Sequence, residues 1–353
     1  MLGNITAIGG NWVKRNLCLA LACSAALASC GTPSAVRSAA SEPVIVNRGN
    51  PIIRDRFTAD PAPLVVGDTL YLYTGHDEAR GDEMFTMRDW LVFSTKDMKT
   101  WTPHAPIMKA TDFKWAKGDA WASQAIEKNG KFYFYAAVAH DDSHPGMAIG
   151  VAVSDRPTGP FTDARGSALI TNQMTPEGTH SWEDIDPTVF TDDDGVTWIA
   201  WGNRDCYIAK LKANMTEIDG PIRKITPPHY EEGPWLHKRG DLYYLIYASF
   251  DRKTQSAEHT SYATATSLDG PWTYRGELTA SAKNSFTIHA GVADFKGQTY
   301  IFLHNATLTI GDQGGAVGRR AVTVEYLQYN PDGTLKPVVQ TEAGVSVPPP
   351  PFN

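Results

Sequence analysis

Three acidic residues, one tryptophan and one histidine stand at equivalent places in a repeated pattern of this 353-residue chain. Each lies seven to nine residues before a turn that opens an aromatic run: Asp60, Trp121, Asp186, Glu232 and His289. Three carboxyl groups at one site would repel one another, so a merely structural role gives no reason to keep them. Hydrolysis of a glycosidic bond gives one, because an acid must protonate the leaving oxygen while a carboxylate activates water on the opposite face.

The remaining groups suit the same chemistry. A third carboxylate can hold the proton of the acid by repulsion and can orient the sugar. Trp121 offers a flat apolar wall to a sugar ring. His289 is either a core histidine with satisfied hydrogen bonds or a group that binds water or a hard cation beneath the substrate.

Each acidic residue also has an ordinary structural interpretation. Asp60 and Asp186 both precede proline, and Asp-Pro is common where a strand begins or a turn forms. Glu231 is the rival of Glu232 for the role of the acid. Because neighbours in a strand point to opposite faces, we expect only one of them to face the site. The shared register across the repeats favours the functional interpretation.

The elements that must position these residues form five repeats, each with hairpin-type turn residues followed by an aromatic strand. The five runs are residues 67–73, 130–135, 194–199, 240–245 and 297–302. Five similar units without helical periodicity predict an all-β chain folded as a five-bladed β-propeller. The strand before each aromatic strand would line the central axis. A β-sandwich is the competing architecture, but its strands do not repeat in five equivalent groups.

Composition and charge exclude some functions. The formal net charge is −7, and no run of Lys or Arg is present, so nucleic-acid binding is not expected. Ten Trp, fourteen Tyr and thirteen Phe suit strands and the lining of a sugar-binding cleft. Of the four cysteines, we expect only Cys206 to remain unmodified in the folded body, as a buried core residue.

The N-terminus has the features of an export signal. Lys14 and Arg15 precede an apolar run at residues 17–27, which is too short to span a bilayer permanently. The following Ser29-Cys30-Gly31 is typical of a bacterial lipoprotein processing site, at which Cys30 becomes the lipidated first residue. An ordinary signal peptide with a chance cysteine is the alternative. We therefore expect an exported protein of the periplasm or outer membrane, with the lipid anchor as its only membrane attachment.

These features divide the chain into four parts. A Ser/Ala/Pro-rich stretch after the signal is expected to be a flexible tether, and the run of prolines near the C-terminus a terminal extension or a surface strap. The parts are a signal peptide at 1–30, a tether at 31–48, the propeller at 49–340 and a Pro-rich tail at 341–353.

The ordered set of motifs at the heads of the repeats resembles glycoside hydrolase family 43, five-bladed propeller enzymes that act on xylan and arabinan side chains and oligosaccharides. The resemblance covers residues 50–338. It rests on Ala59-Asp60-Pro61, Ala120-Trp121-Ala122, Ile185-Asp186-Pro187, Glu232-Gly233-Pro234 and residues 318–334. Each motif is weak alone, whereas the ordered set is specific.

The resemblance implies a role for each matching residue. Asp60 corresponds to the general base, Glu232 to the general acid, and Asp186 to the carboxylate that tunes the pKa of the acid and orients it. Family members invert the anomeric configuration, which fits a base and an acid about 6.5–9.5 Å apart. His289 matches a central histidine that in many members lies beneath the sugar, often beside a calcium ion.

The resemblance also indicates the substrate. In the family an arginine near the last blade commonly contacts sugar hydroxyls, and both Arg319 and Arg320 are candidates. No appended β-sandwich is evident, and the motifs are most similar to those of the single-domain branch, where β-xylosidase and α-L-arabinofuranosidase activity often coexist. The expected function is release of terminal xylose or arabinofuranose from hemicellulose oligosaccharides, with no required cofactor. An arabinan-degrading exo- or endo-enzyme and a non-catalytic glycan-binding propeller are the alternatives.

Overall fold

The computed structural model describes residues 44–175, 178 and 180–349. The expected signal peptide and Cys30 lie outside the described residues. No helix within the described ranges is long and apolar enough to cross a membrane.

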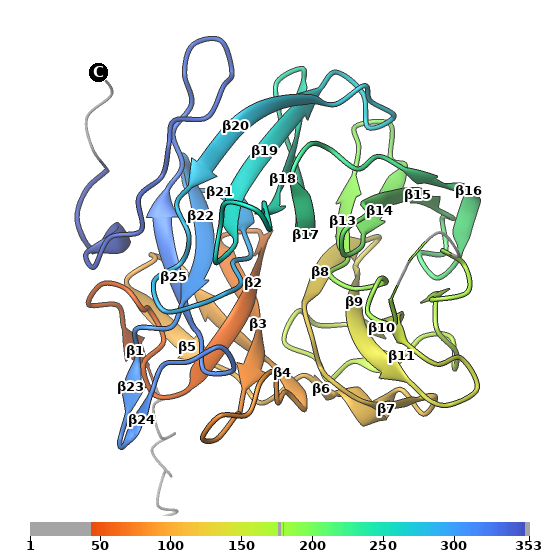
Figure 1. The fold of residues 1–353 in the computed structure, drawn as a ribbon, viewed down its shortest axis with the longest axis horizontal. Helices are drawn as coiled ribbons and strands as arrows, with labels where there is room; N and C mark the ends of the chain where they lie inside the picture. The colour runs from red at the N-terminus through yellow and green to blue at the C-terminus, as the bar shows by residue number, and fades with distance from the viewer. Residues whose placement is uncertain (1–43, 176–177, 179, 350–353) are drawn as a thin grey trace, which may run out of the picture. The chain divides into compact units, whose positions relative to one another are not determined.

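Five antiparallel sheets and one separate two-stranded hairpin make up the described part of the chain (Figure 1). The first contains β2 (Phe57–Val66), β3 (Thr69–Asp77), β4 (Asp89–Thr95) and β5 (Thr100–Pro103), with β1 (Ile45–Val46) beside β5 and β6 (Met108–Lys109) beside β4. The second contains β7 (Ala116–Gly118), β8 (Ser123–Lys128), β9 (Lys131–His140), β10 (Met147–Ser154), β11 (Thr162–Asp163) and β12 (Ile170–Thr171). A short 3₁₀ helix, η1 (Ala110–Asp112), precedes the second sheet.

The third and fourth sheets are simple four-stranded meanders. The third contains β13 (Thr188–Thr191), β14 (Thr197–Trp201), β15 (Tyr207–Leu211) and β16 (Ile218–Lys224). The fourth contains β17 (Tyr230–Arg239), β18 (Leu242–Ser249), β19 (His259–Ala265) and β20 (Thr273–Thr279). The fifth has β21 (Gly291–Phe295), β22 (Gln298–Asn305) and β25 (Ala321–Tyr326), and β23 (Thr309–Ile310) and β24 (Gln313–Gly314) form a separate hairpin.

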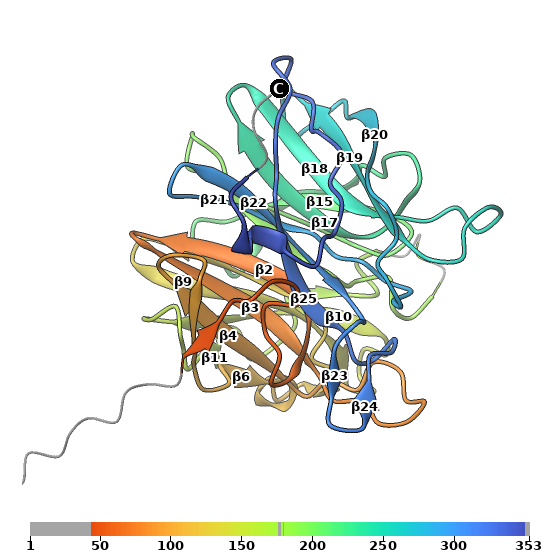
Figure 2. The same ribbon diagram turned by 90° about the vertical axis from the view of Figure 1, so that its left-hand side faces the viewer.

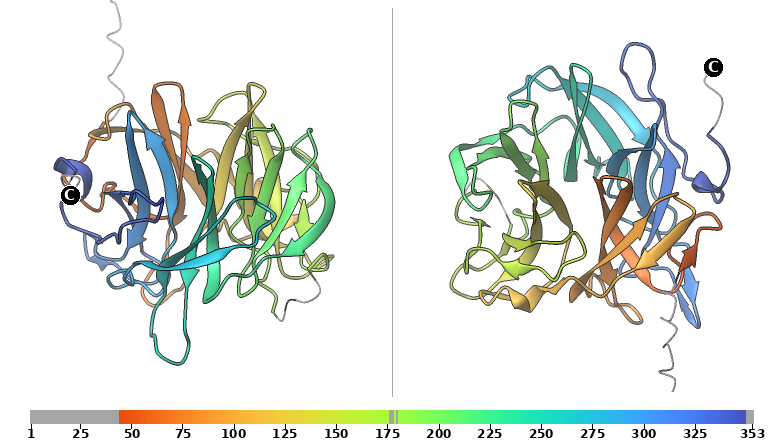
Figure 3. Two further views of the ribbon diagram at one scale, coloured as in Figure 1. Left: turned by 90° about the horizontal axis from the view of Figure 1, so that it is seen from above. Right: turned by 180° about the vertical axis from the view of Figure 1, so that it is seen from behind.

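One strand from each of the five sheets takes part in a closed central ring. Strand β2 contacts β8, and the contacts continue in order through β13, β17 and β21 back to β2. Figure 3 shows the five sheets from behind, arranged around this ring. The prediction of a five-bladed β-propeller is therefore confirmed.

Each expected hairpin forms where the sequence predicted it. The aromatic runs become β3, β9, β14, β18 and β22, the second strand of every blade. Gly67 and Gly130 adopt positive φ in the tight turns, a conformation that glycine adopts without steric cost.

Hydrophobic side chains fill the space between neighbouring blades. One cluster joins Tyr135 and Val151 of the second blade to Ile199 and Trp201 of the third. Because both faces of such a sheet are covered, a central strand such as β19 is buried along its whole length. Cys206 is buried in the cluster between the third and fourth blades, as expected for a core residue, and burial raises the pKa of its thiol to about 12.

The start of the described chain fastens the last blade to the first (Figure 2). The Asn50 side chain accepts a hydrogen bond from the Val324 amide at 2.9 Å and donates to Glu325 Oε1 at 2.9 Å. The Ile52 amide donates to the Val322 carbonyl at 3.0 Å. These bonds satisfy buried polar groups and close the ring.

Two boundaries differ from those expected. The tether was expected to reach residue 48, yet Ile45–Val46 pair with Thr100 and Trp101 of β5. The sequence predicts a Pro-rich tail from residue 341 onward. In the structure, however, η2 (Gly344–Ser346) packs on β25 with Val345 buried. Hydrogen bonds of Thr341 to Glu325 hold this segment in place. Both segments contain a few apolar or hydrogen-bonding residues that bind to the propeller. The Ser/Ala/Pro-rich composition around them predicted flexible chain instead.

Candidate active site

The heads of three blades use left-handed backbone to direct functional side chains. Asp60 has φ 51° at a register shift in β2, and Asp186 has φ 58° just before β13. Aspartate tolerates this region better than most residues, although the conformation is uncommon outside glycine. Strained backbone that the surrounding structure enforces is typical of functional sites.

In the fourth blade the left-handed residue is Gly233, which has φ 57° and directly follows Glu232. A Cβ added to Gly233 would lie 2.7 Å from the ring of His289, so only glycine allows this close approach. The register of β17 shifts on both sides of Glu232. These bulges interrupt the alternation of side chains, and both Glu231 and Glu232 therefore line the same cavity. The expectation that only one of them faces the site was wrong.

All five residues at the heads of the repeats line one cavity of about 350 Å³. The residues around it are Asp60, Met84, Phe85, Met87, Trp121, Ala122, Trp182, Ile185, Asp186, Asn203, Arg204, Glu231, Glu232, Arg252, Glu258, Phe286, Thr287, His289 and Arg320. The structure thus brings together Asp60, Trp121, Asp186, Glu232 and His289 from five separate blades.

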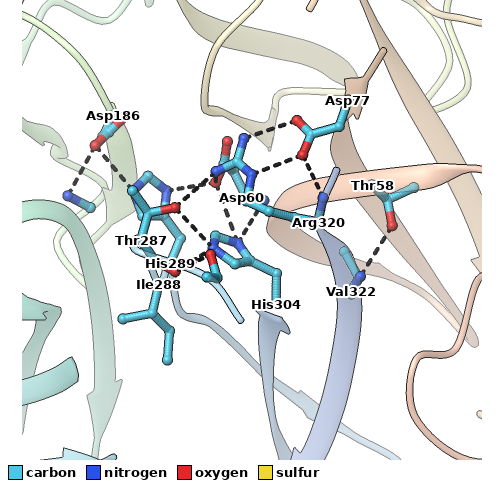
Figure 4. Close-up of polar contacts among 12 residues, drawn as sticks. Thr58, Asp60, Asp77, Asp186, Thr287, Ile288, His289, His304, Arg320 and Val322 are labelled. Atoms are coloured by element: carbon cyan, nitrogen blue, oxygen red, sulfur yellow. Dashed lines mark hydrogen bonds and ion pairs between the residues drawn. The ribbon is translucent and has the colours of Figure 1, made fainter. Parts of the chain in front are cut away.

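His289 lies among the three carboxyl groups. Figure 4 shows it between Asp60 and Asp186. Its Nδ1 is 3.3 Å from Asp60 Oδ1, while its Nε2 is 3.3 Å from Asp186 Oδ2 and 3.2 Å from Glu232 Oε1. Burial lowers the pKa of His289, but attraction to Asp186 and Asp60 outweighs burial and raises it well above its ordinary value. The imidazole is therefore protonated, and each ring nitrogen donates to a carboxylate.

Arg320 binds the carboxylate of Asp60 and is almost completely buried. Its Nη1 donates to Asp60 Oδ1 at 2.9 Å, while its Nε and Nη2 donate to the two oxygens of Asp77 at 2.9 and 3.0 Å. The bidentate pair with Asp77 fixes the guanidinium beside Asp60 (Figure 4). Arg319 lies elsewhere, donating to the carbonyls of Gly314 and Gly81. Of the two candidate arginines, the structure places Arg320 in the cavity and Arg319 outside it.

His304 holds the backbone of Asp60. The Asp60 amide donates to His304 Nδ1 at 3.3 Å, and His304 Nε2 donates to the Thr287 carbonyl at 2.9 Å. Burial, with repulsion from Arg320 and His289, holds the pKa of His304 well below its ordinary value. The ring is therefore neutral, with its proton on Nε2, as these two hydrogen bonds require.

Glu232 and Asp186 lie on the other side of His289. Asn203 donates to Glu232 Oε2 at 2.7 Å, and the Gly233 amide donates to Asp186 Oδ2 at 3.1 Å. Burial raises the pKa of Asp186 to about 6, against the attraction of His289 and with the repulsion of Glu232 and Asp60. No arginine or lysine forms an ion pair with either carboxyl group among the residues that the structure describes.

Aromatic and apolar side chains form the walls and the mouth of the cavity. Trp121 packs edge-on against Phe85, with ring centroids 6.0 Å apart, and its Nε1 has no hydrogen-bond partner among the described residues. Trp182, Phe286 and Met84 remain 44%, 41% and 60% exposed at the mouth. Such surfaces suit the apolar faces of sugar rings.

Several residues of this site escaped the sequence prediction. Asp77 and His304 lie at or near the C-terminal ends of β3 and β22, and Asn203 follows the end of β14. In an antiparallel hairpin the end of the second strand lies beside the head of the first, as the pairing of Phe57 with Asp77 shows. Polar residues that end the aromatic runs were therefore the available signal.

The family model described as "Glycosyl hydrolases family 43" matches residues 48–335. The chain belongs to glycosyl hydrolase family 43. An arabinoxylan arabinofuranohydrolase of Bacillus subtilis is 30% identical over 85% of this chain, which spans 66% of that protein's length. A xylosidase/arabinosidase 43A of Humicola insolens is 28% identical and is matched over 98% of its length and 81% of this chain.

The same similarity holds in three dimensions. The solved structure of CoXyl43, a β-xylosidase/α-arabinofuranosidase from a compost microbial metagenome, has a TM-score of 0.72 with this family 43 chain. The two are 26% identical, and the match covers 84% of this chain and 99% of CoXyl43. The fold, the family and the class of enzyme, a glycoside hydrolase, follow from these matches.

The residues around His289 do not fit a directly bound calcium ion in this family 43 chain. Asp186, Glu232 and His289 are close enough to share an ion. Calcium takes six to eight oxygen ligands, whereas this set offers two carboxyl groups and one imidazole. A second cavity of about 20 Å³ lies against His289 and Ser123, whose buried Oγ has no partner in the described ranges. This space fits one water molecule.

Proposed function

We propose that this family 43 chain is an inverting exo-glycosidase that releases terminal xylose or L-arabinofuranose from plant hemicellulose oligosaccharides. The observation that carries the proposal is the placement of Asp60 and Glu232 against opposite ring nitrogens of His289 in one cavity. The imidazole separates the two carboxyl groups. Separated carboxyl groups are what an inverting mechanism needs, because the attacking water must fit between the base and the sugar.

The proposed reaction has one chemical step. Protonated Glu232 gives its proton to the glycosidic oxygen as the bond to the anomeric carbon breaks. Asp60 takes a proton from water as the water oxygen attacks the same carbon from the opposite face. The products are a sugar of inverted configuration and a shortened oligosaccharide, with Asp60 protonated and Glu232 ionised. Proton exchange with solvent restores the starting state.

The surrounding residues support these two roles. Arg320, fixed by Asp77, balances the negative charge that Asp60 needs as a base. Asn203 holds Oε2 of Glu232, which fixes the carboxyl group of the proposed acid beside His289. Asp186 and its bond to Gly233 keep the acid-bearing backbone of β17 in place. In this proposal no step uses calcium.

The relatives support the choice of sugars. Their names include arabinofuranohydrolase and xylosidase/arabinosidase, and both sugars present similar hydroxyl groups to a cavity. A cavity of about 350 Å³ with Trp121 on its wall suits a terminal sugar better than the middle of a chain. Exo action and preference for either sugar are parts of the proposal.

Hydrolysis of 4-nitrophenyl β-D-xylopyranoside and 4-nitrophenyl α-L-arabinofuranoside tests the activity. We expect turnover of at least one of them, and release of single sugars from xylo- or arabinoxylo-oligosaccharides. NMR of the first product formed should show inversion at the anomeric carbon. No hydrolysis of any of these substrates, or retention of configuration, would contradict the proposal.

We also propose that the protein is exported and lipid-anchored at Cys30. Support comes from the apolar run at residues 17–27 and from the Ser29-Cys30-Gly31 sequence alone. Mass spectrometry of the protein from bacterial membranes should find a diacylglyceryl group on Cys30. A Cys30→Ser variant should lose it, and a mature unlipidated N-terminus at another residue would contradict this proposal.

A further inference from the structure

Glu258 is a buried acidic residue in the wall of the cavity that the proposed reaction leaves without a role. It immediately precedes β19, is 1% exposed and lines the same cavity as Glu232 and His289. Its backbone amide donates to the Phe286 carbonyl at 2.9 Å. Its side-chain Oε2 accepts a hydrogen bond from the Ile288 amide at 3.1 Å.

The second carboxyl oxygen of Glu258 is available to a ligand. Oε1 accepts no hydrogen bond from the described residues, and it is not among their buried side-chain atoms without a partner. Glu258 lines the cavity, so a group bound there can reach this oxygen. A polar side chain this deeply buried normally uses both of its oxygens.

The surroundings favour the neutral form of Glu258. Burial and repulsion from Glu232 raise the pKa of Glu258 well above its ordinary value, against the attraction of His289 and the hydrogen bond from the Ile288 amide. The guanidinium of Arg320 is bound to Asp60 and Asp77, and that of Arg252 pairs with Glu231. A neutral carboxyl group has one O–H donor, whereas an ionised one has none.

A purely structural role explains only half of this arrangement. Joining the loop before β19 to the Ile288 amide requires a single acceptor atom, which an amide side chain would provide without a titratable group. A structural role of this kind does not require the Glu258 side chain to line the cavity. Sugar hydroxyls both donate and accept, so a neutral carboxyl group matches them where ionised carboxylates can only accept.

We propose that Glu258 is a substrate-binding residue whose Oε1 hydrogen-bonds a ring hydroxyl of the terminal sugar. This inference rests on the proposed glycosidase function and adds a determinant of sugar recognition to it. Glu258 would act on binding and orientation of the sugar, not on the transfer of the proton from Glu232.

Monodeoxy sugars test this contact. The substrate is whichever 4-nitrophenyl glycoside the wild type cleaves faster, together with its derivatives that lack one ring hydroxyl at a time. For Glu258→Ala we expect kcat/KM on the parent substrate to fall about 10- to 100-fold. For one deoxy substrate, the same substitution should lower kcat/KM much less, because the hydroxyl group that Glu258 binds is already missing. An equal loss on the parent and on every deoxy substrate would overturn the proposal.

Two further variants separate binding from folding. Glu258→Gln keeps an acceptor for Ile288 and offers new donors at the cavity, so it should keep the fold and change the relative rates for one deoxy substrate only. If Glu258→Ala does not fold, unchanged relative rates in Glu258→Gln would overturn the proposal.

Glu325, a buried carboxyl group that binds Asn50 and Thr341 outside the cavity, is the matched control. Glu325→Ala should lower the melting temperature and leave the ratios of kcat/KM between the parent and the deoxy substrates unchanged. A wild type without activity would contradict the proposed function instead.

Discussion

The two sides of the candidate active-site cavity, divided by His289, differ in their balance of charge. On the Asp60 side, two carboxyl groups share the guanidinium of Arg320, and neutral His304 fixes the backbone. On the Glu232 side, burial raises the pKa of both Asp186 and Glu258. There the hydrogen bonds to Glu232 and Asp186 come from neutral Asn203 and Gly233, and His289 is the only cation in contact with them among the described residues.

This difference matches the two roles that the reaction requires. A general base must be ionised at rest, and a nearby arginine stabilises that form. A general acid must hold a proton at rest, and a site with more carboxyl groups than cations disfavours further negative charge. The predictions below alter one side of the cavity at a time.

Removal of Arg320 should have the largest effect on stability. Arg320→Ala leaves Asp77 buried without its cation and Asp60 with His289 alone, and we expect the free energy of unfolding to fall by about 3–5 kcal/mol. Activity should be lost as well. Arg319→Ala is the control, because Arg319 binds only carbonyl groups outside the cavity. Thermal and urea unfolding measure both variants, and equal stability of the two would show that the Asp60 side does not depend on Arg320.

Replacement of Asp186 tests the excess of carboxyl groups on the acid side. Its pKa in the folded state is about 6 against an ordinary 3.8, so its effect on stability is fully present below pH 4 and is lost as the pH rises through 6. This difference corresponds to up to about 3 kcal/mol at pH 7. Asn cannot titrate, so Asp186→Asn should gain stability relative to the wild type between pH 4 and pH 7 while losing activity. A difference in stability that does not change with pH would contradict this assignment.

Removal of Asn203 should have a smaller effect. Asn203→Ala deletes the hydrogen bond to Glu232 Oε2, and we expect kcat/KM on oligosaccharides to fall about tenfold. Asn214→Ala, which deletes an exposed hydrogen bond to Glu217, is the control and should leave the rate unchanged. Wild-type rates in both variants would mean that Asn203 does not position the acid.

Chelation should have no effect. The protonated imidazole of His289 supplies the positive charge at the axis, so dialysis against EDTA should leave both activity and melting temperature unchanged. A loss of either that calcium restores would show that a metal ion, and not His289 alone, balances the carboxyl groups.

Much of the fold was predictable because its signals are local. A turn followed by an aromatic strand occurs five times, and counting back from each turn found Asp60, Trp121, Asp186, Glu232 and His289, all of which line one cavity. The roles of these residues stay predictions until variants are measured.

The rest depends on long-range pairing that the sequence does not display. The choice between Arg319 and Arg320 depends on which side chain β25 directs toward Asp60, more than 250 positions earlier in the chain. Asp77 reaches the site because β3 ends beside the head of β2. The bulges of β17 turned both Glu231 and Glu232 to the cavity and broke the expected alternation. Glu258 lies outside every repeat motif, and only the three-dimensional packing of the 286–289 stretch brings it there.

The assignment of base and acid to opposite sides of His289 is tested most directly by the dependence of rate on the leaving group. Glu232→Ala and Asp60→Asn are compared on an oligosaccharide, whose leaving group needs a proton, and on a 4-nitrophenyl glycoside, whose leaving group needs little help. We predict that Asp60→Asn loses about 10²- to 10⁴-fold on both, and that Glu232→Ala loses a similar factor on the oligosaccharide and far less on the nitrophenyl glycoside. Equal losses of the two variants on both substrates, or full activity of Glu232→Ala, would contradict the account.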